Sequence, residues 1–142
     1  MSRAPARLIL HASAVAVADR AALIVGASGA GKSALALEMM ALGAELVADD
    51  QVVLERRGDA LHAAAPPALR GIVEARGIGL LRAEPREAVV ALVADLDHAP
   101  AARMPQKCEI AYLGVEIELI FVKGVPTLAA ALIQMLRCGR AG

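Results

Sequence analysis

Aromatic side chains are nearly absent from this chain of 142 residues, which has no tryptophan, one tyrosine (Tyr112) and one phenylalanine (Phe121). Two rings are too few for the stacking platforms that hold single-stranded nucleic acid. A charge excess is also absent, because 15 basic residues balance 15 acidic ones. A broad electrostatic surface for a phosphate backbone is therefore missing, and we expect no nucleic acid partner.

Cysteines and long apolar runs are scarce as well. Cys108 and Cys138 do not have the spacing of a metal site. We expect both thiols to be free, as is usual in a reducing compartment, and we expect a cytoplasmic protein. No apolar stretch approaches the ~18 residues of a membrane-spanning helix, and so we expect no membrane association. The length is that of one domain, covering residues 1–142.

Residues 26–33 form a phosphate-binding motif. They fit the pattern G-x-x-x-x-G-K-[ST] at each fixed position, being Gly26, Ala27, Ser28, Gly29, Ala30, Gly31, Lys32 and Ser33. Glycines let consecutive backbone N–H groups face phosphates, and the following helix begins there with its positive dipole end. We expect Lys32 to reach the outer phosphates and Ser33 to hold Mg²⁺, so that the motif predicts ATP and Mg²⁺ as ligands. A glycine-rich turn that binds nothing is the alternative.

The segments on either side of the motif have the character it needs. Ala21 to Val25 is a short apolar run that predicts a buried strand, and Ser33 to Leu42 predicts a helix that stops at Gly43. The rest of the chain predicts strands near residues 8–11, 14–17, 45–48, 51–55, 60–64, 79–82, 88–94, 109–113 and 115–122, and a second helix with Pro126 in its first turn, over residues 126–137. The predicted strands therefore far outnumber the two helices, and hairpins join several of them. We expect an α/β domain with a mixed sheet, in contrast to ordinary strand–helix alternation.

Two further segments, in order behind the phosphate loop, carry a resemblance to a known family. They are Leu46-Val47-Ala48-Asp49-Asp50 and Ile72-Val73-Glu74-Ala75-Arg76-Gly77-Ile78-Gly79. With the loop, they make the chain resemble the C-terminal catalytic domain of HPr kinase/phosphorylase over roughly residues 11–137. The resemblance implies a P-loop-containing fold related to phosphoenolpyruvate carboxykinase and an ATP-dependent serine kinase. Its implied partner is HPr, the phosphocarrier protein of the sugar phosphotransferase system, and its implied assembly is a hexamer. We expect a short form without the amino-terminal domain of longer family members.

Asp49 and Asp50 end an apolar strand, and so we expect them at the sheet edge beside the phosphate loop. Alternation along a strand would send them to opposite faces. The resemblance implies that one of them takes the proton of the substrate serine during phosphorylation and returns it in the reverse reaction. We favour Asp50 for this role and keep Asp49 as a holder of metal or water. A solvated strand-end pair is the alternative.

The same resemblance implies roles for four other residues. His11 corresponds to a histidine that acts at the active site. Glu74 would hold Mg²⁺ together with Ser33, and the planar fork of Arg76 suits a phosphate or a carboxylate. Arg103 stands near the place of a later active-site arginine, with an exposed loop arginine as the alternative.

The resemblance weakens near the end of the chain. The family carries two arginines around Pro-Gly that matter for dephosphorylation, whereas residues 121–126 offer only Lys123 as a cation. The kinase direction is thus expected, and retention of the phosphorylase direction stays open. Two rivals also remain: a small-molecule kinase or ATPase that holds its metal with Asp95 at the end of residues 88–95, and a nucleotide-sensing module without turnover.

Overall fold

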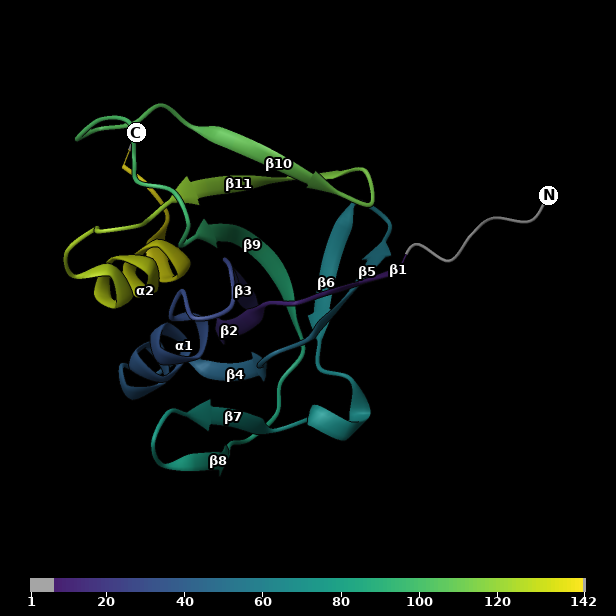
Figure 1. Cartoon of the computed structure of the whole chain (residues 1–142). Helices are drawn as coiled ribbons and strands as arrows, with labels where there is room; N and C mark the ends of the chain where they lie inside the picture. Colours follow the sequence, from purple (N-terminus) through teal and green to yellow (C-terminus); the bar gives the residue numbers. More distant parts are fainter. Residues whose placement is uncertain (1–6, 142) are drawn as a thin grey trace.

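The computed structural model describes residues 7–141, which form a mixed sheet, a separate two-stranded hairpin and two helices (Figure 1). In chain order the elements are β1 (Arg7–Leu10), β2 (Ser13–Val17), β3 (Arg20–Val25), α1 (Lys32–Ala41), β4 (Glu45–Ala48), β5 (Val52–Arg57), β6 (Ala60–Ala64), a 3-10 turn (Pro67–Leu69), β7 (Ile72–Ala75), β8 (Gly79–Arg82), β9 (Ala88–Asp95), β10 (Cys108–Tyr112), β11 (Val115–Phe121) and α2 (Leu128–Cys138). This arrangement confirms the predicted mixed α/β fold.

The main sheet has the strand order β1-β5-β6-β9-β3-β2-β4, and the β10–β11 hairpin joins it through β11. Strand β9 is the branch point, because it pairs with β6 near its beginning, with β11 near its end and with β3 on the other side. The β3–β9 and β9–β11 pairs are parallel, whereas the remaining pairs are antiparallel. The parallel β3–β9 pair is the part that positions the phosphate loop, since both strands end at the same edge.

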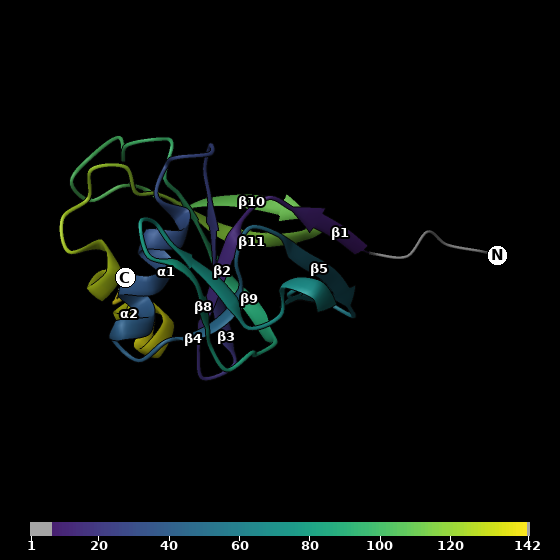
Figure 2. The ribbon, with the colours of Figure 1, turned by 60° about the horizontal axis from the view of Figure 1, so that its bottom comes forward.

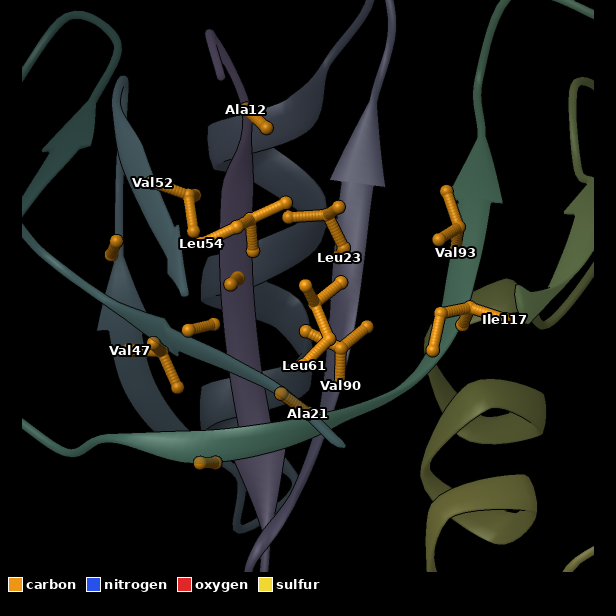
Figure 3. Close-up of a cluster of buried hydrophobic side chains, with 14 of the residues drawn as sticks. Ala12, Ala21, Leu23, Val47, Val52, Leu54, Leu61, Val90, Val93 and Ile117 are labelled. Atoms are coloured by element: carbon orange, nitrogen blue, oxygen red, sulfur yellow. The ribbon is translucent and has the colours of Figure 1, made fainter. Parts of the chain in front are cut away.

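The core consists of two apolar clusters on opposite faces of the sheet, and side chains alternate between them along β3. Along β3, Ala21 and Leu23 point into one cluster, and Ala22 and Ile24 point into the other. The first cluster lies between strands, where the sheet curls over itself; its members include the ten residues labelled in Figure 3. A strand that is buried on both faces has a continuous apolar sequence, and for this reason β3 could be predicted from its apolar run.

Both helices cover the same side of the sheet, as the two views in Figures 1 and 2 show. Leu35, Ala36 and Met39 of α1 and Leu132, Ile133 and Leu136 of α2 complete the second cluster. The helices also contact each other at their C-terminal ends, where the Arg137 guanidinium donates to the Leu42 carbonyl at 3.5 Å. No helix within residues 7–141 is long and apolar enough to cross a bilayer.

Two details differ from the expectation. The four-residue strand β7, which pairs with β8 alone and has only Val73 buried, was not predicted. Helix α2 begins at Leu128, after Pro126, so that the prediction of a proline in its first turn was wrong. The reason is that Thr127 has φ 51°, a left-handed conformation that no α-helix continues through.

We expect the core clusters to dominate the stability of the fold. Leu23→Ala removes a fully buried side chain from the first cluster and should lower the free energy of unfolding by about 3 kcal/mol, through lost burial and the cavity left behind. Leu80→Ala is the control, because Leu80 is 71% exposed and should change stability little. Urea denaturation measures both values, and equal losses would contradict this assignment of the core.

Candidate active site

The phosphate loop connects the end of β3 to the beginning of α1. Gly29 and Gly31 have φ values of 86° and 101°, a region that side chains with a Cβ rarely adopt. Lys32 is 8% exposed, and its Nζ donates to the carbonyl oxygens of Gly26 (2.7 Å) and Ala27 (3.0 Å). An ammonium has three donors, and the loop uses two of them. The lysine is thus tethered to the base of the loop while it still lines the adjoining cleft.

Asp49 is buried directly behind this loop, with 5% exposure. Its carboxylate accepts hydrogen bonds from Ser13 Oγ at 2.6 Å, from Ser33 Oγ at 2.8 and 2.9 Å, and from the backbone N–H of Glu74 at 2.9 Å. A buried carboxylate needs such donors, because burial without them is costly. One side chain at the end of β4 therefore joins β2, α1 and β7 around the site.

Asp50 turns the other way. Its φ of 71° is left-handed, a conformation that aspartate tolerates better than most residues. The side chain is 63% exposed, and its Oδ1 lies 2.9 Å from His11 Nε2. The two neighbouring aspartates thus diverge, one beneath the phosphate loop and the other on the solvent side.

These elements enclose a cleft of about 500 Å³. Its walls come from the β1–β2 connection and the beginning of β2, the phosphate loop, α1, the segment after β4 and the β7–β8 hairpin. The lining residues are His11, Ser13, Ser28, Gly29, Gly31, Lys32, Ser33, Ala34, Leu37, Asp50, Glu74, Ala75 and Arg76. His11, Lys32, Ser33, Asp50, Glu74 and Arg76, predicted from separate parts of the sequence, meet here.

Two predicted or considered cations are not brought to the cleft. Arg103 is exposed in the loop between β9 and β10, and Lys123 is exposed after β11; neither lines the cleft. The structure thus gives the proposed role of Arg103 no support.

The cleft has oxygen ligands for a divalent cation, although few of them are carboxylates. The Ser33 hydroxyl donates its hydrogen to Asp49, which leaves its lone pairs available, and Glu74 faces the same cleft. Within residues 7–141 no group of three or more His, Cys, Asp or Glu side chains could hold a metal by itself. This donor set suits Mg²⁺, which usually combines one or two protein ligands with phosphate oxygens and water.

Asp95, the metal holder of the rival interpretation, is engaged elsewhere. It ends β9, where its Oδ1 accepts the N–H of Asp97 at 2.7 Å and its Oδ2 lies 2.9 Å from His98 Nδ1. It does not line the cleft. Asp49 instead contacts Ser33, the phosphate-loop residue that holds Mg²⁺ together with an aspartate in P-loop enzymes.

Sequence reasoning missed Ser13 and Asp97. Ser13 was visible as the lone hydroxyl at the head of an otherwise apolar strand. Asp97 follows the strand that pairs in parallel with β3, and its carboxylate accepts the N–H of Ala27 in the phosphate loop. Only the pairing of β3 with β9, which the sequence pattern did not provide, could have identified it.

Known proteins resemble this chain in sequence and in fold. The sequence model of the HPr Serine kinase C-terminal domain matches residues 3–86, more than half of the chain. The HPr kinase/phosphorylase of Chromobacterium violaceum is 46% identical over 74 residues, 51% of this chain and 23% of that protein. The one from Caldanaerobacter subterraneus is 42% identical over 76 residues, 53% of this chain and 25% of that protein. The matched segment therefore spans about a quarter of these curated relatives.

The fold has a solved counterpart. The structure of the Hpr(Ser) kinase/phosphatase from Coxiella burnetii superposes with a TM-score of 0.77 at 22% sequence identity, covering 92% of this chain and 94% of that one. The likeness in fold therefore extends well beyond the segment in which the sequence similarity is strong.

Loss of the Asp49 carboxylate should destabilise the whole site. Asp49→Ala leaves three donors without an acceptor, and we expect the free energy of unfolding to fall by about 3 kcal/mol. Asp49→Asn keeps an acceptor oxygen and should cost less, and Asp50→Asn, on the solvent side, should cost little. Chemical denaturation of the three variants tests this order, and a stable Asp49→Ala protein would contradict it.

Proposed function

Because this chain belongs to the HPr Serine kinase C-terminal domain family, we propose that it transfers the γ-phosphoryl group of ATP to a serine hydroxyl of an HPr-like phosphocarrier protein in the cytoplasm. The observation that carries the proposal is the convergence of a phosphate loop, a buried carboxylate behind its serine and an exposed carboxylate in one cleft.

The nucleotide side of the cleft is the phosphate loop. Backbone N–H groups of the loop and the N-terminal end of α1 favour bound phosphates. Lys32 contributes a positive charge where negative charge builds up during transfer. When bound, Mg²⁺ neutralises phosphate charge; Ser33 and Glu74 would hold it, with Asp49 keeping the serine hydroxyl oriented.

The acceptor side is the exposed carboxylate of Asp50. It accepts the proton as the substrate serine oxygen bonds to phosphorus and the bond to the β-phosphate oxygen breaks, so that phosphoserine and ADP are the products. The hydrogen bond with His11 holds this carboxylate in one orientation. Arg76, across the cleft, is a donor for phosphate oxygens.

A protein substrate is favoured over a small molecule by the surface beside the cleft. The turn and second strand of the β7–β8 hairpin present Ile78 and Leu80, which are 79% and 71% exposed, next to Glu74 and Arg76. Exposed apolar side chains grouped beside a reactive centre are suited to a protein partner. The engagement of Asp95 within its own loop counts against the small-molecule kinase, and the intact set of Lys32, Ser33, Asp49 and Asp50 counts against a module without turnover.

We propose the kinase direction as the main activity. The phosphorylase direction would use Asp50 to return the proton, but Lys123, the cation of residues 121–126, does not line the cleft. We also propose that the protein forms a homo-oligomer, a hexamer by its resemblance to the family. The outer edges of β1 and β10, which have no further strand beside them within residues 7–141, are where copies could associate.

Lys32→Ala tests the nucleotide side. Removal of the ammonium should lower the rate of phosphoserine formation on HPr at least about a hundredfold, because it loses several kcal/mol of transition-state stabilisation. Labelled ATP and purified HPr provide the measurement. An unchanged rate would overturn the proposed nucleotide site.

Asp50→Asn tests the acceptor side. The amide cannot take the serine proton, and so kcat should fall at least about a hundredfold while ATP affinity stays near that of the unmodified chain. Asp59→Asn, a change at a fully exposed carboxylate in the β5–β6 turn, is the matched control and should leave both values unchanged. A parallel loss of ATP affinity and kcat in Asp50→Asn would argue against a proton acceptor.

A further inference from the structure

We propose that Asp97 is a positioning residue of the phosphate loop, which it holds in its binding conformation through the backbone N–H of Ala27. The inference rests on the proposed function in that the loop binds phosphate, and it adds a residue that acts from behind the loop. Asp97 lies outside the phosphate-binding motif, which covers residues 26–33.

The contact is direct and uses both carboxylate oxygens. Asp97 Oδ1 and Oδ2 lie 3.1 and 3.0 Å from the Ala27 nitrogen. It arises because β3 and β9 are parallel neighbours, with Val25 opposite Asp95 and the Leu96 N–H donating to the Val25 carbonyl at 2.9 Å. The segment after β9 therefore emerges beside the segment after β3.

Asp97 is itself held in place. Its N–H donates to Asp95 Oδ1, and the other oxygen of Asp95 contacts the His98 ring, which packs edge-on against Phe121 with 5.6 Å between ring centroids. The His98 carbonyl accepts the N–H of Lys123 at 3.0 Å. These contacts fix the turn after β9 against β11, so that the Asp97 carboxylate is oriented toward the Ala27 N–H before any ligand binds.

The packing between the two segments is close. A Cβ on Gly26 would lie 3.3 Å from Leu96 Cβ and 3.4 Å from Asp97 Oδ1, and 3.1 Å from Ala30 Cβ within the loop. A glycine at this position thus permits the approach of the β9 segment as well as the turn of the loop itself.

The consequence concerns the ammonium of Lys32. Ala27 is held from two sides, since Asp97 accepts its N–H and Lys32 donates to its carbonyl. The Ala27 N–H belongs to the same peptide unit as the Gly26 carbonyl, which is the other acceptor of the lysine, and release of this N–H would free that anchor. Loss of the Asp97 contact should therefore weaken phosphate binding.

The charge of Asp97 acts in the opposite direction. A carboxylate near a triphosphate repels it, so that removal of the charge alone should tighten binding. Asp97 does not line the cleft, and hence its charge lies behind the loop. Asp97→Asn removes the charge but keeps an acceptor oxygen, whereas Asp97→Ala removes both. The two variants therefore separate positioning from simple repulsion.

Calorimetric titration with Mg²⁺–ATP and with Mg²⁺–pyrophosphate measures the effect. We expect Asp97→Ala to raise Kd about tenfold, the size of one charge-assisted hydrogen bond, and Asp97→Asn to bind as tightly as the unmodified chain or more tightly. Asp59→Ala is the matched control for loss of an exposed carboxylate and should change nothing. Thermal unfolding midpoints of the ligand-free variants should agree within a few degrees, because Asp97 is exposed.

A second readout needs no nucleotide. In the ligand-free protein, amide exchange by NMR should be faster at Ala27 in Asp97→Ala than in the unmodified chain or in Asp97→Asn. Unchanged exchange at Ala27 in Asp97→Ala would overturn the proposed contact. This readout does not depend on whether the protein is a kinase. Equal effects of the two variants on Kd, in either direction, would overturn the positioning role while leaving the kinase proposal intact.

Discussion

The candidate site depends on the hydrogen bonds that the buried carboxylate of Asp49 accepts. This carboxylate gathers the hydroxyls of Ser13 and Ser33 and a backbone N–H of β7, three donors that belong to different elements. Because a buried charge is tolerated only when it is hydrogen-bonded, these elements must meet at this point for the fold to be stable. The stability of the domain and the orientation of the phosphate-loop serine thus share one cause.

The parallel β3–β9 pair provides the second constraint. Two strands that run in the same direction end at the same edge, and the segments that follow them lie side by side. One of these segments is the phosphate loop and the other carries Asp97. Most of the remaining sheet is antiparallel. Both helices cover one side of it, and the cleft lies between α1 and the β7–β8 hairpin.

Local patterns revealed much of this design in advance. The phosphate motif with a strand before it and a helix after it, the mixed sheet, and the strand ending at Asp49 and Asp50 all follow from short-range rules of periodicity and turn chemistry. The divergence of the two aspartates was also expected, although its cause is the left-handed backbone of Asp50 rather than strand alternation alone. Strand β7, a four-residue strand with one buried side chain, was not predicted.

What could not be read in advance are the partners of the polar groups. Ser13 and Asp49 are separated by 36 residues, and Ala27 and Asp97 by 70. Periodicity places a side chain on a face of its own element, but a hydrogen bond between elements depends on which strands pair and in which register. The amino-acid order therefore specified the chemistry of the phosphate loop and its flanking acids. The tertiary structure decided that Asp49 lies beneath the loop, that Asp50 faces solvent and that Asp97 supports the loop from behind. Only long-range packing brings these carboxylates within hydrogen-bonding distance of their partners.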